Sequence, residues 1–135
     1  MKLLLALLIA TGAAAPAPAA APSPNGTWRN AANSVHVRVA PCPRARATLC
    51  GTVIWANAKA KADVAARGGA LVGEQLFRDF VREDDGLWYG QVYVPDLART
   101  FSGTLDLDGP DRLVGEGCLL GSFGCRQQVW TRLKK

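Results

Sequence analysis

The chain has 135 residues, 49% of them hydrophobic and 20% charged, with a formal net charge of +5 at pH 7. This length suits one domain with a single core. The 16 Lys and Arg residues are scattered along the chain, whereas nucleic-acid binding and polybasic membrane surfaces need them gathered in a patch. We therefore expect neither of these partners.

Residues 1–21 are predicted to be a signal peptide followed by an Ala/Pro-rich linker. Lys2 gives a positive start, residues 3–10 form an apolar run too short to span a bilayer, and small residues follow. The prolines of the next tract cannot continue a helix. Because no later segment is long and apolar enough to cross a membrane, we expect an exported protein, periplasmic or secreted and not membrane-embedded. Residues 22–135 would form its one domain.

The rest of the chain reads mainly as short antiparallel strands. In residues 35–39 (VHVRV), three valines alternate with His36 and Arg38, which is the pattern of a half-buried strand. Turn residues such as 84–86 (DDG) and 108–110 (DGP) separate most of the other strand-like segments. Those segments are residues 26–30, 48–57, 71–81, 87–94, 99–107, 112–118 and 126–133.

Residues 56–69 (ANAKAKADVAARGG) differ from the strands. They are rich in helix-forming residues and end in two glycines, which predicts a short helical segment between the third and fourth strands.

The number and length of the strands predict an all-β fold. About eight short antiparallel strands in about 110 residues are typical of a closed up-and-down barrel or of a sandwich. Glycines within the strands favour the barrel, because tightly curved sheets need glycine where a strand bends. These glycines are Gly51, Gly73, Gly90, Gly103 and Gly115.

The four cysteines are predicted to form disulfides. An even number of cysteines in a small exported chain is typical of disulfide bonding. Of three possible connectivities we favour the local ones, Cys42 with Cys50 and Cys118 with Cys125, because each pair brackets a loop between two strands. Zinc-binding knuckles and a Cys-x-x-Cys redox motif need closer spacing, so we predict no metal and no cofactor.

No arrangement of side chains in the sequence predicts catalysis, and we expect that the protein is not an enzyme. His36 is the single histidine and lies on the polar face of its strand, which indicates a surface residue. The acidic run 83–85 precedes Gly86 and is better explained as a hairpin turn. The serines have no base and partner beside them in the sequence.

The aromatic residues offer two interpretations. Eight-stranded barrels either fill with side chains or hold one small ligand. The first interpretation is a binding protein in which a small apolar or amphipathic ligand contacts Trp55, Phe77, Trp88, Tyr93 and Phe101. The second is a structural or interaction protein of the cell envelope, with a filled barrel and its function on the loops. The sequence does not identify a protein partner for it.

Several motifs together resemble the uncharacterised bacterial family called domain of unknown function 2147, from about residue 26 to 132. They are Gly26-x-Trp28, Cys42, Leu49-Cys50-Gly51, Trp55, Gly73, Trp88-x-Gly90-x-Val92-Tyr93-x-Pro95 and Gly117-Cys118, followed by Cys125-Arg126-x-Gln128-x-Trp130-Thr131-Arg132. The resemblance implies an exported bacterial, lipocalin-like barrel with no established activity. After Pro95, residues 96–101 (DLARTF) depart from the family pattern, and its usual tyrosine is missing.

The same resemblance implies roles at one barrel end. The opening Gly26-x-Trp28 is similar to the start of true lipocalins, in which the tryptophan plugs the closed end. A late arginine, Arg126 or Arg132, would then cover the Trp28 ring in a cation–π contact. Trp130 is expected at this structural end as well.

Overall fold

A computed structural model describes residues 9–16, 22–121 and 123–134 of the chain. The predicted signal peptide and linker lie outside these residues, apart from 9–16, which form neither helix nor strand. No helix among the described residues has the length and apolar character needed to cross a membrane.

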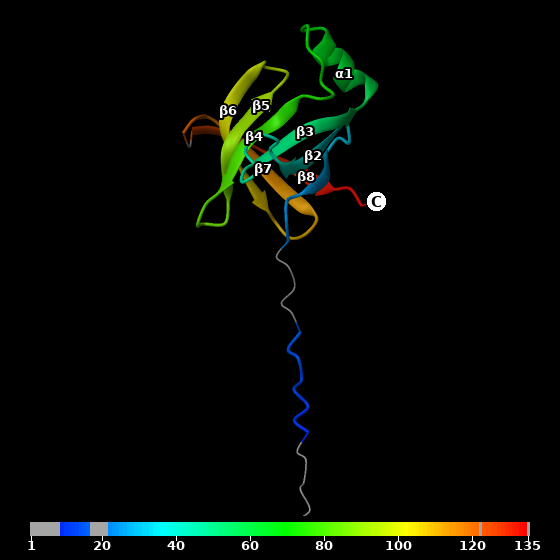
Figure 1. Cartoon of the computed structure of the whole chain (residues 1–135). Helices are drawn as coiled ribbons and strands as arrows, with labels where there is room; N and C mark the ends of the chain where they lie inside the picture. Colours follow the sequence, from blue (N-terminus) through cyan, green and yellow to red (C-terminus); the bar gives the residue numbers. More distant parts are fainter. Residues whose placement is uncertain (1–8, 17–21, 122, 135) are drawn as a thin grey trace, which may run out of the picture.

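Eight antiparallel strands follow one another around a closed barrel, and β8 pairs back with β1 (Figure 1). They are β1 (Gly26–Asn30), β2 (Val35–Pro41), β3 (Leu49–Ala56), β4 (Gln75–Arg82), β5 (Trp88–Val94), β6 (Arg99–Leu107), β7 (Arg112–Leu120) and β8 (Phe123–Arg132). The up-and-down barrel is therefore confirmed, and the sandwich is excluded.

The predicted helix is present between β3 and β4 as α1 (Ala58–Ala65). Asn57 caps it, because its side-chain oxygen accepts a hydrogen bond from the Ala60 backbone N–H at 2.8 Å. Gly68, with φ +83°, lies just beyond its end. Figure 1 shows α1 at the end of the barrel opposite to where the N-terminal chain enters. We call the α1 end the open end and the other the closed end.

The largest differences from the predicted element boundaries are at β4 and at the β7–β8 hairpin. The fourth strand begins at Gln75, not near residue 71, because Gly73 adopts φ +93° in a turn and donates its N–H to Val53 O at 2.8 Å. Gly73 is therefore a turn glycine and not a strand glycine. The last two strands are longer than predicted, since their hairpin continues past the cysteines to the pair Leu120 and Phe123.

The barrel interior is filled mainly at its centre and its closed end. Its most deeply buried side chains are Trp28, Val37, Val39, Val53, Phe80, Leu105 and Leu113. The Phe80 ring packs directly over the β5 backbone, and a Cβ added at Gly90 would lie 2.7 Å from its Cγ atom. Glycine at this position thus lets a large ring occupy the core of a tightly curved sheet.

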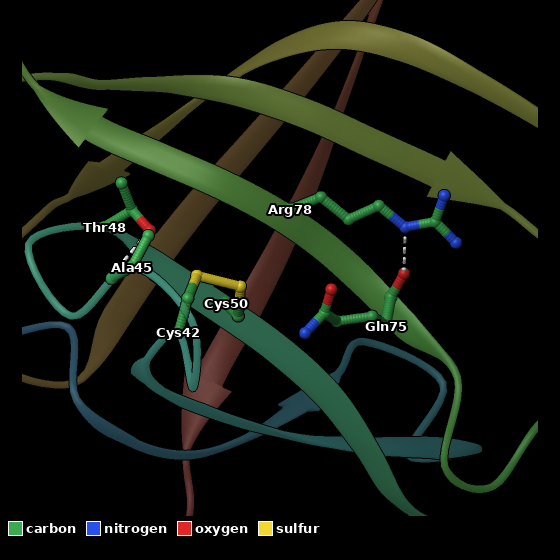
Figure 2. Close-up of a disulfide and its surroundings, with 6 residues drawn as sticks. All are labelled: Cys42, Ala45, Thr48, Cys50, Gln75 and Arg78. Carbon is green, nitrogen blue, oxygen red and sulfur yellow. Dashed lines mark hydrogen bonds between the residues drawn. A yellow bond between two sulfur atoms is a disulfide. The ribbon is translucent and has the colours of Figure 1, made fainter.

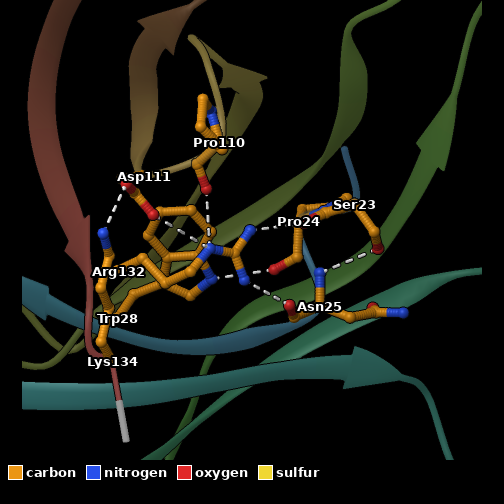
Figure 3. A network of polar contacts seen from close by, with 8 residues as sticks. All are labelled: Ser23, Pro24, Asn25, Trp28, Pro110, Asp111, Arg132 and Lys134. Carbon is orange, nitrogen blue, oxygen red and sulfur yellow. Dashed lines mark hydrogen bonds and ion pairs between the residues drawn. The ribbon is translucent and has the colours of Figure 1, made fainter. Parts of the chain in front are cut away.

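Trp28 closes the barrel beneath a guanidinium group (Figure 3). The tryptophan is fully buried, and its Nε1 donates a hydrogen bond to Pro24 O at 2.8 Å. The Arg132 guanidinium carbon lies 4.3 Å from the centroid of the ring, a cation–π distance. Of the two arginines that the resemblance offered for this contact, Arg132 is the one that makes it.

Arg132 also ties three segments together at the closed end. Its side chain donates hydrogen bonds to Pro110 O at 2.7 Å, to Asn25 O at 2.6 Å and to Ser23 O at 2.6 Å. Figure 3 shows these bonds converging from the β6–β7 turn and from the chain that precedes β1. One side chain thus satisfies three carbonyl groups that β-ladders leave unpaired.

The cysteines pair locally, as predicted, and one pair lies toward each end of the barrel. Cys42 and Cys50 are 1.99 Å apart at their sulfurs, between β2 and β3 toward the closed end (Figure 2). The loop they bracket is held by a hydrogen bond from Cys42 N to Thr48 O at 2.9 Å. Cys118 and Cys125 are 2.06 Å apart in the β7–β8 hairpin at the open end.

Candidate ligand-binding cavity

Two adjoining cavities lie at the open end, with volumes of about 620 Å³ and about 520 Å³. We call the larger one, beside the β7–β8 hairpin, the hairpin cavity, and the other, beside α1, the helix cavity. Their shared wall consists of Phe77, Val92, Val94, Asp96 and Gln128. Each volume falls in the range of about 300–1,000 Å³ that small-molecule sites occupy.

The hairpin cavity exists because two inward positions of β7 carry no side chain. Gly115 and Gly117 both line it, and a Cβ added at Gly117 would meet nothing within 4 Å. Opposite them, the apolar side chains of Phe77, Val92 and Phe101 line the cavity. The hairpin cavity is therefore an apolar slot between these side chains and the β7 backbone at the two glycines.

Polar groups occupy the β8 side of the hairpin cavity. Arg126 pairs in register with Gly117, and Gln128 pairs with Gly115, so both alternate positions of β8 line the cavity. Asp96 and Glu116 also border it. A few polar groups around an apolar slot are typical of sites that orient a small ligand.

Trp130 follows Arg126 and Gln128 along β8, nearer the closed end, and lines the helix cavity. Its ring packs edge-to-face on Phe77, with the centroids 5.6 Å apart. Its buried Nε1 has no hydrogen-bond partner among the described residues and lies 3.7 Å from the position of a Cβ on Gly115. Because surrounding atoms cover this nitrogen, a ligand could accept a hydrogen bond from it only after a small shift of the neighbouring groups.

The structure places the five aromatic residues of the predicted ligand site in different surroundings. Phe77 borders both cavities, Phe101 the hairpin cavity and Tyr93 the helix cavity. Trp55 and Trp88 line neither of them. Trp55 is 42% exposed on the outer face, and Trp88 packs against the core beside Leu105.

Of the four residues expected at the closed end, Trp28 and Arg132 lie there and two lie elsewhere. Arg126 borders the hairpin cavity, and Trp130 borders the helix cavity. Trp28 pairs with Arg132 across β1 and β8. Arg126 lies six residues before Arg132 on the same strand, about 20 Å away at strand spacing.

Several lining residues were not predicted from the sequence, notably Val92, Gly115, Gly117 and Gln128. The signal for Gln128 was present, because Arg126, Gln128, Trp130 and Arg132 alternate along one strand and must share a face. Glycines add nothing to a hydrophobic pattern. Gly115 and Gly117 were therefore identified as lining residues from their pairing with Gln128 and Arg126 of β8.

The acidic run 83–85 forms the β4–β5 turn, as the sequence indicated. Gly86 has φ +84° and donates its N–H to Glu83 O at 3.0 Å. Tyr89 Oη donates to Asp85 Oδ2 at 2.5 Å, and this bond, with a second from the Leu87 N–H, lowers the pKa of Asp85. The Asp85 carboxylate therefore stabilises a turn at the closed end, away from both cavities.

Two groups of cysteine and acidic side chains are close enough together to suggest metal ligands. They are Cys42, Cys50 and Asp79, and Glu116, Cys118 and Cys125. In both, the two cysteines are joined in a disulfide, whereas metal binding requires the free thiolate. We therefore assign no metal to either group.

His36 lies outside the barrel, stacked on Trp55 with ring centroids 4.3 Å apart, and its Nε2 lies 2.7 Å from Asn33 Oδ1. Burial, and then the charge of Arg29, lower the pKa of His36 from 6.5. Below pH 6.5 the unfolded chain therefore takes up a proton more readily than the folded protein, and the free energy of unfolding decreases. We expect His36→Gln to lose less stability than the wild-type protein between about pH 7 and about pH 5.

Urea denaturation at both pH values measures this difference. Arg29→Gln is the matched variant, because it removes the neighbouring positive charge and keeps the histidine. In this variant the free energy of unfolding should still decrease between the two pH values, by less than in the wild-type protein and by more than in His36→Gln. An identical decrease in the free energy of unfolding in the wild-type protein and His36→Gln would contradict the prediction.

Residues 26–132 match the family model described as "Uncharacterized protein conserved in bacteria (DUF2147)". The chain belongs to this family. The match spans the whole barrel, from the first residue of β1 to the last residue of β8. No curated protein and no solved structure gives a significant match. The function of this DUF2147 protein must therefore be argued from its own geometry.

Proposed function

We propose that the barrel is a binding protein that holds one small apolar or amphipathic molecule in the hairpin cavity. The observation that carries this proposal is the open slot of about 620 Å³ between the glycines of β7 and the apolar side chains of Phe77, Val92 and Phe101. An apolar ligand would be held there by burial of its surface, and the polar groups of Arg126 and Gln128 would orient it.

We propose a binding role and not catalysis. The polar lining of the hairpin cavity consists of Asp96, Glu116, Arg126, Gln127 and Gln128. Among these described residues there is no nucleophile with an adjacent base. The Glu116 carboxylate is already paired, since Gln127 Nε2 donates to it at 2.9 Å.

We further propose that the protein works outside the cytoplasm, in the bacterial envelope or beyond it. The two disulfides support this, because such bonds persist in oxidising compartments. The apolar run and small residues at the start of the chain, typical of a signal peptide, support it independently. Mass spectrometry of the N-terminus of the protein from its own host would test export, since an uncut N-terminus on cytoplasmic protein would contradict it.

Filling the cavity tests the binding role. Gly117→Leu adds a side chain into open space, at a residue without the positive φ that would strain it. We expect saturable changes in tryptophan fluorescence when medium- or long-chain fatty acids, or uncharged apolar alcohols, are added to the wild-type protein. Gly117→Leu should weaken binding by about tenfold or more, equal to about 1.4 kcal/mol.

The matched control is Thr104→Leu, which places the same leucine side chain on the outer face of neighbouring strand β6, where Thr104 pairs with Glu116. It should bind as the wild-type protein does. The absence of any saturable response across the panel would contradict ligand binding. Equal weakening in both variants would contradict the location of the site.

A structural or interaction role in the envelope is the second candidate. The side chains that fill the centre and the closed end of the barrel, such as Trp28 and Phe80, favour it, because they leave the loops and turns to carry the function. It predicts that crosslinking through these turns captures a specific protein partner, and that Gly117→Leu leaves this capture unchanged.

A further inference from the structure

Four large apolar side chains are exposed on two turns of the open end. Leu119, Leu120 and Phe123 flank the β7–β8 turn and are 59%, 75% and 76% exposed, and Leu97, on the β5–β6 turn, is 58% exposed. We call these four residues the apolar tip. Single exposed apolar residues are ordinary on protein surfaces, but a group of them at one end marks an interaction site.

The β7–β8 part of the tip is held out from the barrel by covalent and backbone geometry. The disulfide between Cys118 and Cys125 joins the two strands immediately before the tip. Gly121 in the turn and Gly124 at the start of β8 take positive φ angles of 56° and 66°, which glycine adopts without strain. A hairpin closed in this way cannot easily fold its apolar side chains back onto the barrel.

The tip lies beside the mouth of the hairpin cavity. Leu97 and Leu119 belong to both, because each also lines that cavity. Arg126 borders the cavity as well, and Arg99 begins β6 at the same end. Among the described residues, neither arginine has a carboxylate within ion-pairing distance. Apolar side chains thus project at the end of the barrel where two unpaired cations lie.

The size and shape of the tip decide between its candidate partners. A stable protein–protein interface takes about 20–30 residues from each side, and four side chains on protruding turns cannot provide it. A lipid surface needs only a few apolar side chains that reach the acyl boundary, with cations near the headgroups. This argument disfavours a second copy of the chain and a folded protein partner.

We propose that the apolar tip docks the open end of the barrel on a lipid surface. Leu119, Leu120, Phe123 and Leu97 insert among the acyl chains, and Arg99 and Arg126 contact the headgroups. Insertion of apolar groups drives the docking, so binding survives high salt, unlike adsorption by charge alone. Docking does not require a bound ligand. It would, however, turn the mouth of the hairpin cavity toward the lipid surface, which is a source of amphipathic molecules.

Vesicle co-sedimentation of the oxidised protein tests this proposal, with vesicles of phosphatidylethanolamine and phosphatidylglycerol. We expect the wild-type protein to sediment with them. The double variant Leu120→Asp/Phe123→Asp should bind about tenfold or more weakly, since it places two charges where apolar groups insert. Val81→Asp is the matched control, because Val81 is 44% exposed on β4 and pairs with Tyr89, near the closed end. It should bind as the wild-type protein does.

A second measurement does not depend on loss of binding. Phe123→Trp places an indole on the tip, and its emission should shift to the blue with vesicles and be quenched by brominated lipids. Failure of the wild-type protein to bind vesicles would overturn the proposal, as would equal binding by the double variant. Self-association that the double variant abolishes, in the absence of vesicle binding, would assign the tip to a second copy and overturn it as well.

The Gly117→Leu variant separates this proposal from ligand binding. It fills the hairpin cavity but replaces no residue of the tip, so it should still sediment with vesicles. If Gly117→Leu loses vesicle binding together with ligand binding, the tip is not an independent docking surface and the proposal is wrong. Vesicle binding without any ligand response would sustain the docking surface and contradict only the proposed function.

Discussion

Replacing Trp28 with alanine is expected to lower the free energy of unfolding by about 3–5 kcal/mol. The ring is fully buried and fills the closed end, so its removal leaves a cavity that the barrel cannot collapse. It also frees Pro24 O from its hydrogen bond and leaves the Arg132 guanidinium without the ring that it covers. Urea denaturation followed by far-UV circular dichroism measures the loss.

Trp55→Ala is the control for this experiment, because it removes the same side chain from the outer face. Trp55 is 42% exposed, and we expect its loss to lower the free energy of unfolding by about 1 kcal/mol or less. Equal losses at Trp28 and Trp55 would mean that the Trp28 plug contributes no more to stability than surface packing does.

Removal of the two disulfides is expected to have unequal effects. Cys42–Cys50 and Cys118–Cys125 close loops of similar length, with sequence separations of 8 and 7. Chain entropy alone therefore predicts about 2.5 kcal/mol for either. Cys42 and Cys50 are also buried in the barrel wall, so the variant Cys42→Ala/Cys50→Ala should lose about 1 kcal/mol more than Cys118→Ala/Cys125→Ala through lost packing.

Denaturation of the two double variants side by side measures this difference directly. Each serves as the control for the other, because the change in chain entropy nearly cancels. A larger loss at Cys118 and Cys125 would show that the hairpin at the open end contributes more to stability than its exposure indicates.

Local patterns predicted most of the fold. The alternation of three valines with His36 and Arg38 identified β2, and Val37 and Val39 are indeed buried while Arg38 is exposed. The spacing of the cysteines predicted both local pairs, because residues that flank a hairpin loop are neighbours across the ladder. Each of these signals depends only on residues close together in the chain.

The candidate site was less predictable, because it depends on which face each residue takes. In β5 both faces carry apolar residues, so the sequence could not assign Trp88 or Tyr93 to the inside or the outside. Trp55 follows the bulge in the β2–β3 ladder between His36 and Val37, and such a bulge changes which residues point inward. The cavity itself arises from Gly117, a residue without a side chain.

The pairing of β1 with β8, which closes the barrel, connects three residue pairs, whereas β7 and β8 share eight. Brief opening of the native protein should begin at a short ladder such as this one, or at β3–β4, which also shares three pairs. Amide protons along Arg29 and Thr131 would then exchange with solvent sooner than those in the middle of β7. Trp28 and Arg132 face each other across this same short ladder. Their contact, which closes the barrel end, therefore also holds β1 against β8.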